Sequence, residues 1–318
     1  MKNTSFKKIV LLSVMILATG LNPLYSQDNT PNTPEAEFIA LNQNRMEILK
    51  PQSRPFMVSQ GKKAPTAVLI HGLSDSPGSM VEISKIYEKK GYNILTVLLR
   101  DHGMSDEELR HEARAKVKLA DWRKDIDKVM AIAFKMSDSG KIALAGYSLG
   151  GALATDTADR YNGKIASLVL MAPLFKMNHG WAAPAARVLK HVKYSIAKGI
   201  PEAPHFYPDI ALNQTQQAYA LTKHLKKKVT KNAKEELKAL PKIMFLTDAD
   251  STVENDFAIE TAERIAIPSD NIIMYNTIDA DTIVLHRDLP MRRININNKT
   301  NPHIDELLAR LEIFLSDL

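Results

Sequence analysis

The sequence predicts an α/β protein in which helices cover both faces of a parallel sheet. Short apolar runs rich in β-branched residues alternate along the chain with helix-like segments. The runs are continuously apolar, whereas strands with one face in water would alternate polar and apolar side chains. With 45% hydrophobic and 25% charged residues over 318 positions, the composition is that of a globular protein and excludes collagen-like, coiled-coil and mostly disordered chains.

Six segments have the length and composition of buried strands, and helix-like segments lie between them. The strand candidates are 64–70, 93–99, 141–145, 165–172, 242–247 and 271–277. The helical candidates are 79–90, a charged region that continues to about 136, a segment that ends near 160, 255–265 and a final helix. For the final helix we expect Asn301 as N-cap, Pro302 at the first helical position and an apolar face from Ile304 onward.

The strand rhythm is interrupted between residues 173 and 240. Four prolines punctuate helix-like pieces there, and no strand candidate is present. We therefore expect a helical cap over 173–240, inserted into a core formed by 27–172 and 241–318.

The first 26 residues have the layout of a secretory signal peptide. Three lysines precede an apolar run over 9–18, and the stretch ends at Ser26 before Gln27. The run is too short to span a bilayer, which takes about 20 residues. We expect cleavage near Ser26/Gln27 and a secreted or periplasmic protein; a retained, uncleaved anchor is the alternative.

Charge and cysteine content limit the partners and the chemistry. The formal net charge is +6, and three lysines without acids lie in 1–26, so the chain from Gln27 carries +3. Seven lysines crowd Lys223–Lys238, which fits either a solvated helix face or a transient contact with an anionic surface. No aromatic residues interleave with them, so we expect no nucleic-acid binding. The absence of cysteine excludes disulfides, thiolate metal sites and cysteine nucleophiles.

A candidate nucleophile lies in the pattern Gly146-x-Ser148-x-Gly150. The pattern follows the 141–145 strand and precedes a helix, which is the setting of a nucleophile elbow. Such a turn is so sharp that its flanking positions tolerate little side chain, and it pushes the hydroxyl out of the sheet edge. The helix N-terminus also favours negative charge developing there. The alternative interpretation is an ordinary strand-to-helix turn.

A serine hydroxyl needs a base, and the base needs an acid to orient it. Beyond the last strand we choose His286, in a loop, over His303, in the first turn of the final helix, because ligand chemistry collects in loops at the carboxyl ends of strands. Asp248 and Asp250 both follow the 242–247 strand. Asp250 comes after a short turn and is the preferred acid, whereas Asp248 is expected to bond its own turn.

The oxyanion of an acyl-transfer reaction needs two preorganised donors. We expect the backbone N–H of Leu149, directly after the nucleophile, and that of Leu73, in the loop after 64–70. His71 and His102 precede the nucleophile in the chain and are interpreted as structural. The Asp248-x-Asp250-x-Thr252 spacing lacks the glycine and glutamate of a calcium loop, and we expect no metal and no cofactor.

Together these residues resemble the α/β-hydrolase superfamily, and within it the monoacylglycerol lipase and serine aminopeptidase-like branch, over about residues 60–318. The resemblance rests on His71-Gly72, His102-Gly103, Trp122, Gly146–Gly151, Ala172-Pro173, Asp250, His286 and the Asn-Pro-His-Ile-Asp-Glu start of the final helix.

The resemblance implies a mostly parallel sheet of about eight strands flanked by helices, a triad and a variable lid. Ser148, Asp250 and His286 carry over as nucleophile, acid and base, with Leu73 and Leu149 as oxyanion donors. Two positions depart from the family: Thr247 stands where glycine is common, and His286 lies in an atypical Leu-His-Arg-Asp setting.

A serine nucleophile implies acyl transfer to water rather than the alkyl-ester chemistry of relatives with an aspartate nucleophile. Cap aromatics are expected either to line an acyl pocket or simply to pack the cap onto the sheet; the four chosen are Phe175, Trp181, Phe206 and Tyr207. Esters or monoacylglycerol-like lipids are the first expectation. An aminopeptidase, with Glu202 or Asp209 holding a free amino terminus, is the second. A non-catalytic binding protein that uses the Lys223–Lys238 face is the third.

Overall fold

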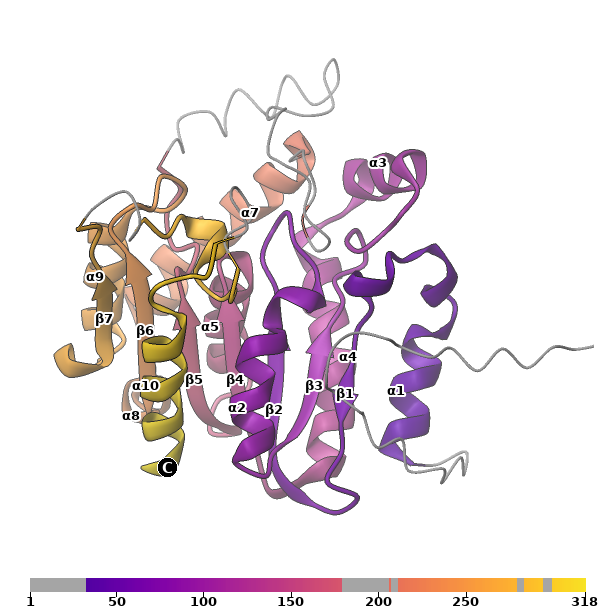
Figure 1. Cartoon of the computed structure of the whole chain (residues 1–318), viewed down its shortest axis with the longest axis horizontal. Helices are drawn as coiled ribbons and strands as arrows, with labels where there is room; N and C mark the ends of the chain where they lie inside the picture. The colour runs from indigo at the N-terminus through magenta and orange to yellow at the C-terminus, as the bar shows by residue number, and fades with distance from the viewer. Residues whose placement is uncertain (1–32, 179–205, 207–210, 279–282, 294–298) are drawn as a thin grey trace, which may run out of the picture.

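A computed structural model of the chain describes residues 33–178, 206, 211–278, 283–293 and 299–318. Within them, seven strands form one sheet in the order β1-β3-β2-β4-β5-β6-β7 (Figure 1). The strands are β1 (Met57–Val58), β2 (Ala64–Ile70), β3 (Asn93–Val97), β4 (Ser137–Tyr147), β5 (Ile165–Met171), β6 (Lys242–Thr247) and β7 (Ile272–Tyr275). The predicted signal peptide lies outside the described residues.

The sheet is parallel except at one edge. β1 pairs antiparallel with β3, and every other neighbouring pair is parallel. The six parallel strands correspond to the six apolar runs, and β2 and β6 have the predicted bounds. The expected number of about eight strands is corrected to seven in the described part of the chain. β1 was not predicted because two residues give no periodic signal.

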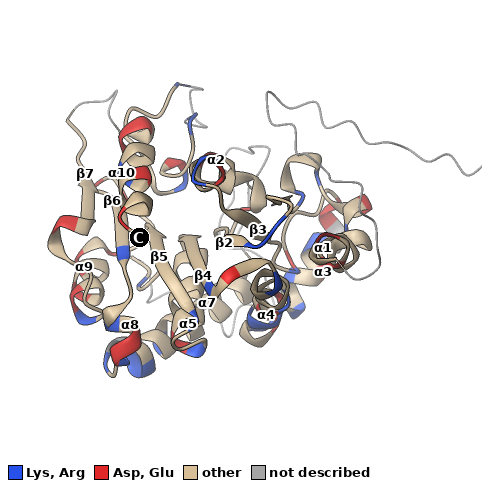
Figure 2. Cartoon of the chain, turned by 90° about the horizontal axis from the view of Figure 1, so that it is seen from below, with Lys and Arg blue, Asp and Glu red and all other residues tan. Residues whose placement is uncertain are grey.

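Helices form a layer on each face of the sheet. One face is covered by α2 (Val81–Lys89) and α10 (Ile304–Ser316), which Figure 2 shows in a view from below the orientation of Figure 1. The other layer contains α1 (Pro34–Gln43), α4 (Leu119–Met136), α5 (Leu149–Arg160), α7 (Leu212–His224) and α9 (Asn255–Arg264). Two further helices are α3 (Glu107–Lys116), which contacts α7, and the short α8 (Glu235–Ala239).

Alternate side chains of each strand enter two separate apolar clusters. In β2, Val68 and Ile70 join the cluster under α4 and α5, while Ala67 and Leu69 join the one under α2 and α10. All four side chains are completely buried. Burial on both faces explains why the strand sequences are continuously apolar.

The final helix begins later than the sequence suggested. The first residue of α10 is Ile304 and its N-cap is His303, so Asn301 is not the helix cap. Instead the Asn301 side chain accepts a hydrogen bond from the His303 N–H (2.9 Å) in a turn before the helix. The apolar face of α10 is buried as expected.

The described part of the 173–240 segment contains helices and loops. Its regular elements are α7, a π-helical turn over Leu225–Thr230 and α8, and these described positions contain no strand. Five of the seven lysines of Lys223–Lys238 lie in these three elements, and Lys231 and Lys234 lie between the π-helical turn and α8. Lys234 and Lys238 form ion pairs with Asp159 and Glu235, so part of this charge is already neutralised.

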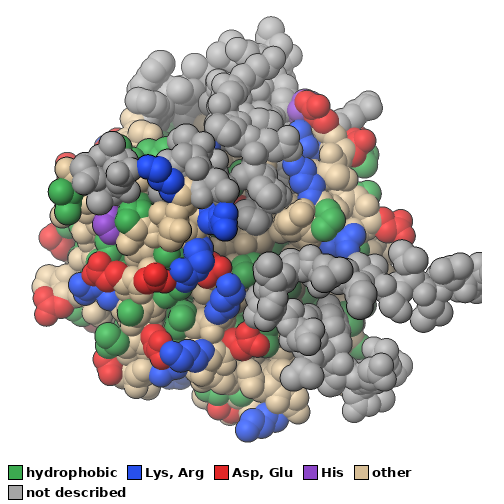
Figure 3. All heavy atoms as spheres, in the orientation of Figure 1, with side chains coloured by type: hydrophobic (Ala, Val, Ile, Leu, Met, Phe, Trp, Pro, Cys, Tyr) green, Lys and Arg blue, Asp and Glu red, His purple; other side chains and the backbone are tan. Residues whose placement is uncertain are grey.

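Charges of both signs are interspersed over the face shown in Figure 3. None of the described helices is both long enough and apolar enough to cross a membrane.

Candidate active site

Ser148 stands at the junction of β4 and α5 with a backbone φ of 54°. An L-residue rarely adopts this conformation, and here it projects the side chain from the turn. The two flanking glycines are required by close contacts. A Cβ on Gly146 would lie 2.2 Å from the Gly150 carbonyl oxygen, and one on Gly150 would lie 2.0 Å from the Ile70 carbonyl oxygen. The turn can therefore form only with glycine at both positions.

The backbone of Ser148 is fixed by the end of β5. Its N–H donates to the Met171 carbonyl (2.9 Å), and its own carbonyl accepts from the Leu174 N–H (2.9 Å). These bonds hold the strained residue in one conformation, so the position of the hydroxyl is set by the sheet.

The structure brings Ser148, His286 and Asp250 into one hydrogen-bonded chain. Ser148 Oγ lies 2.8 Å from His286 Nε2, and His286 Nδ1 lies 2.6 Å from Asp250 Oδ2. An ionised carboxylate only accepts hydrogen bonds, so Nδ1 carries the hydrogen and Nε2 presents a lone pair to the serine hydroxyl. The imidazole is thus oriented to take a proton from Ser148.

Asp250 is held rigidly in the turn that follows β6. Its Oδ1 accepts from the N–H groups of Thr252 (2.8 Å) and Val253 (2.9 Å), which leaves Oδ2 for His286. Its side chain is inaccessible to solvent, and that of His286 is 10% exposed.

Asp248 and His303 lie elsewhere. Both carboxylate oxygens of the exposed Asp248 accept hydrogen bonds from Thr277, at 2.7 and 2.8 Å, so it joins the ends of β6 and β7 in addition to its backbone hydrogen bond with Ala249 in its own turn. The Thr277 hydroxyl bond lowers the pKa of Asp248. The ring of His303 stacks on Tyr275, with centroids 4.8 Å apart. Of the two acids and two histidines considered from the sequence, the structure brings only Asp250 and His286 to Ser148.

The segment that carries His286 is anchored by side chains from two strands. Tyr147 Oη donates to the His286 carbonyl (3.1 Å), and Thr247 Oγ1 donates to the Val284 carbonyl (2.7 Å). The second bond gives Thr247 a role that glycine, common at this position in the family, could not fill.

Asn301 anchors the same segment from its other side. Its buried amide nitrogen donates to the carbonyls of Asp288 (3.0 Å) and Met291 (2.9 Å). Asn301, Tyr147 and Thr247 were not predicted as site residues. The sequence signal that could have indicated Asn301 is its position after the segment that carries His286. Because its side chain does not cap the final helix, its amide is available to bind that segment.

The loop after β2 lies directly against Ser148. A Cβ on Gly72 would stand 3.4 Å from the Ser148 Cβ and 2.9 Å from the Tyr147 ring, so only glycine lets this loop approach so closely. The backbone N–H groups of Leu73 and Leu149 donate to no acceptor within the described residues. Both are available as hydrogen-bond donors beside the hydroxyl.

His71 fixes the peptide that contains the Leu73 N–H. His71 Nδ1 lies 2.8 Å from the Gly72 carbonyl oxygen, which belongs to this peptide unit. Nε2 accepts from the Leu99 N–H (3.4 Å), so the ring is neutral with its hydrogen on Nδ1. Burial, followed by the nearby His102, lowers the pKa of His71 well below its usual value.

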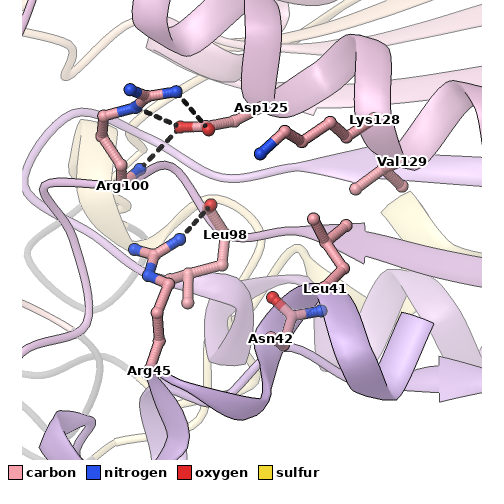
Figure 4. A pocket seen from close by; sticks show the side chains of 8 residues that line it. All are labelled: Leu41, Asn42, Arg45, Leu98, Arg100, Asp125, Lys128 and Val129. Atoms are coloured by element: carbon pink, nitrogen blue, oxygen red, sulfur yellow. Dashed lines mark hydrogen bonds and ion pairs between the residues drawn. The ribbon is translucent and has the colours of Figure 1, made fainter. Parts of the chain in front are cut away.

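The backbone behind His71 is supported by Arg45, which lies just after α1. Arg45 donates to the carbonyls of Leu98 and Leu99, both at 2.9 Å. Arg45 also borders a hollow of about 220 Å³ between α1 and α4, across which Lys128 and the Arg100–Asp125 pair lie (Figure 4). The lining of this hollow contains none of the predicted site residues.

Asp75, in the loop beyond Leu73, is a buried acid that forms no ion pair with any of the described residues. Burial raises its pKa to about 7, although hydrogen bonds from Ser79, Ser76 and Gly72 act in the opposite direction. Its Oδ1 accepts from the Ser76 N–H at 2.7 Å.

The four proposed substrate-binding aromatics are only partly placed. Phe175 is 2% exposed within the main core cluster, and Phe206 is buried against Met291. Phe175 therefore packs the chain onto the sheet and does not line an open surface. Trp181 and Tyr207, like Glu202 and Asp209, lie outside the described residues. No group of three metal-ligating side chains gathers among the positions that the structure describes.

The chain is similar to solved α/β-hydrolase structures over most of its length. One is a structure described with the metagenome-derived lipolytic enzymes LipS and LipT; it has a TM-score of 0.64 and 17% sequence identity, and the match covers 85% of this chain and 100% of that chain. A second is a soluble variant of the monoglyceride lipase from Saccharomyces cerevisiae, with a TM-score of 0.62, 12% identity and coverage of 83% of this chain and 91% of that chain. A third is the monoacylglycerol lipase from Paleococcus ferrophilus, with a TM-score of 0.60, 15% identity and coverage of 83% of this chain and 99% of that chain.

These identities establish the fold alone, and the family follows from a second comparison. The family model described as serine aminopeptidase, S33, matches residues 61–279, which includes the Ser148 elbow, the Leu73 loop and Asp250. The matched region is more than half of the chain. The protein therefore belongs to the serine aminopeptidase S33 family and has the α/β-hydrolase fold.

Proposed function

We propose that this protein is a secreted or periplasmic serine hydrolase that cleaves carboxylic esters, with Ser148 as nucleophile, His286 as base and Asp250 as acid. The observation that carries the proposal is the continuous hydrogen-bonded chain from the Ser148 hydroxyl through His286 to the buried Asp250 carboxylate.

In the first half of the reaction, Ser148 Oγ attacks the ester carbonyl carbon while His286 Nε2 takes the hydroxyl proton. Negative charge develops on the carbonyl oxygen, where the N–H groups of Leu73 and Leu149 would receive it. Collapse breaks the bond to the alkoxy group, and His286 returns the proton to the leaving alcohol. An acyl group then remains on Ser148.

In the second half, His286 takes a proton from water, which attacks the acyl carbon. Collapse releases the carboxylic acid, and the proton goes back to Ser148 Oγ. Asp250 stays ionised throughout and stabilises the imidazolium that forms twice in the cycle. The atoms balance with water as the only co-reactant, so the cycle uses no cofactor.

An ester is the preferred substrate for two reasons. The solved structures described as lipolytic enzymes and monoacylglycerol lipases match at least 83% of this chain, which supports an ester or lipid substrate. The sequence of the 173–240 segment also offers apolar side chains, including Trp181 and Tyr207, for an acyl chain.

Covalent labelling tests the proposal most directly. A fluorophosphonate probe should label the wild-type protein and not Ser148→Ala. Hydrolysis should then be compared between C4 to C12 p-nitrophenyl esters and aminoacyl anilides, because the family also includes aminopeptidases. Faster turnover of anilides would overturn the ester assignment, and absence of labelling in a folded wild-type protein would overturn the hydrolase assignment.

The location is tested separately. We expect the mature protein in the periplasmic or extracellular fraction with Gln27 as its first residue. An intact N-terminus on protein recovered from the cytoplasm would contradict this part of the proposal.

A further inference from the structure

His102, in the turn after β3, is completely buried and binds the loop that carries Leu73. His102 Nε2 lies 2.5 Å from the Leu73 carbonyl oxygen, and Nδ1 lies 2.8 Å from Asp101 Oδ1. The two partners come from separate parts of the chain, since Leu73 follows β2 and Asp101 follows β3. The ring therefore connects the loops at the ends of two neighbouring strands.

The contacts of this ring determine its protonation state. A backbone carbonyl and an ionised carboxylate both only accept hydrogen bonds, so each ring nitrogen must carry a hydrogen. His102 is consequently an imidazolium cation, in contrast to the neutral His71, whose ring centroid is 4.8 Å away.

Asp101 supplies the balancing negative charge. Besides His102, it accepts from Trp122 Nε1 (2.8 Å) and from Gln214 Nε2 in α7 (2.6 Å). Burial by itself would raise the pKa of Asp101, but the His102 charge and the three donors outweigh it and hold the pKa well below the usual range. The carboxylate is thus ionised at neutral pH.

We propose that the buried Asp101–His102 ion pair is a positioning pair for the oxyanion site: it holds the Leu73 carbonyl while His71 holds the Gly72 carbonyl. With both consecutive carbonyls bound, the Gly72–Leu73 peptide cannot rotate, and the Leu73 N–H keeps one direction in the loop that lies against Ser148. The inference rests on the proposed hydrolase function. His102 touches no reacting atom and acts only through Leu73.

The energetics favour a role beyond stability. A buried ion pair is a poor source of folding free energy, since desolvation of the two charges offsets most of their attraction. A neutral His102 could still bind one of its two partners, but not both. The cation is required only if the Leu73 carbonyl must be held as well as Asp101.

Gln214 extends this arrangement to the cap segment. The Gln214 side chain accepts from the Ala211 N–H (3.3 Å) at the start of α7 while it donates to Asp101. The beginning of α7 is therefore tied to the same carboxylate that holds His102.

Kinetics of three variants test the positioning role. His102→Leu should lower kcat by about tenfold to a hundredfold with KM nearly unchanged, since a misdirected oxyanion donor loses most of its transition-state stabilisation. His102→Gln, which keeps one neutral donor, should recover part of that loss. Trp122→Phe removes another donor to Asp101 but leaves His102 in place, and should keep kcat within about threefold.

Rates should be expressed per active site titrated with the fluorophosphonate, which removes the effect of unfolded protein. A His102→Leu enzyme with wild-type kcat per titrated site would overturn the proposal. So would equal losses in His102→Leu and Trp122→Phe, because that pattern indicates general damage.

A second measurement needs no activity at all. In wild-type protein labelled with ¹⁵N-histidine, both nitrogens of one buried ring, assigned by its loss in His102→Gln, should show imidazolium chemical shifts at pH 7. A neutral His102 would refute the inference even if the protein is an active hydrolase. Conversely, absence of hydrolysis beside an imidazolium signal would count against the proposed function and not against the ion pair.

Discussion

Replacing Asp250 with asparagine tests the proposed acid through the direction of its two oxygens. The N–H groups of Thr252 and Val253 both donate to Oδ1, so an asparagine would place its carbonyl oxygen there. Its NH₂ group would then face His286 Nδ1. A donor at that position forces the hydrogen of the ring onto Nε2, which faces Ser148 as a donor and no longer as a base.

The size of the effect follows from the alternative orientation. If the asparagine rotated to accept from Nδ1, its NH₂ would face the two backbone N–H groups and leave both buried donors unsatisfied. Each such group costs about 1–3 kcal/mol, so the productive orientation lies about 2–6 kcal/mol higher. At about 1.4 kcal/mol per tenfold change in rate, kcat/KM should fall by roughly 30-fold to 10⁴-fold.

Hydrolysis of a p-nitrophenyl ester at pH 7 to 9 measures this change, and Asp248→Asn is the matched control. Asp248 is exposed and binds Thr277, so its replacement should leave kcat/KM within about twofold. Retention of more than about a tenth of the activity in Asp250→Asn, or an equal loss in Asp248→Asn, would refute the reasoning.

Three further predictions concern Asp75, two glycines and Asn301. Because burial raises the pKa of Asp75 from 3.8 to about 7, the native state binds the extra proton and stability falls as the pH rises through this window. The Tm of Asp75→Asn relative to wild type should therefore increase between pH 4 and pH 8, and a constant difference would contradict the assignment. Gly150→Ala should not fold because of its close contacts, whereas Gly163→Ala, which is strained only by its positive φ and has no atom within 4 Å of its Cβ, should lose about 1–2 kcal/mol; equal stability of the two would contradict the contact argument. Asn301→Ala should lower the free energy of unfolding by about 2–3 kcal/mol, and it should reduce kcat by a larger factor than it changes KM. An unchanged urea midpoint would exclude the anchoring role of Asn301.

The parts of the fold that could be predicted are those with a local signal. The apolar runs that became β2 and β6 are buried on both faces, except for Pro65 in β2, and nothing beyond their own composition is needed to recognise them. The elbow is equally local, since contacts between Gly146, Gly150 and the end of β2 dictate the glycines. The acid could be chosen because a turn separates Asp250 from the strand, which lets it reach across to another loop.

What the sequence did not reveal depends on contacts between distant residues. Asn301 is a residue type that is common at helix N-caps, but its amide nitrogen binds backbone carbonyls 10 to 13 residues earlier in the chain. His71 and His102 were interpreted as structural from chain order alone. Their role emerges only when β2 and β3 pair in parallel and place the two following turns at one sheet edge. For Phe175, residue type left both a pocket and simple packing open, and the structure buries its side chain in the core.

The anchorage of the Ser148 backbone has a consequence for how such enzymes diversify. Its backbone hydrogen bonds within the described residues go to Met171, Leu174 and Ala152, all of which lie before residue 178. Replacing the sequence between 178 and 211 should therefore leave these backbone bonds of Ser148 intact. Retaining Gln214 downstream of the replacement would preserve the hydrogen bond to Asp101. Under the proposed function, such an exchange is expected to alter substrate selectivity while the hydrolytic residues keep their positions.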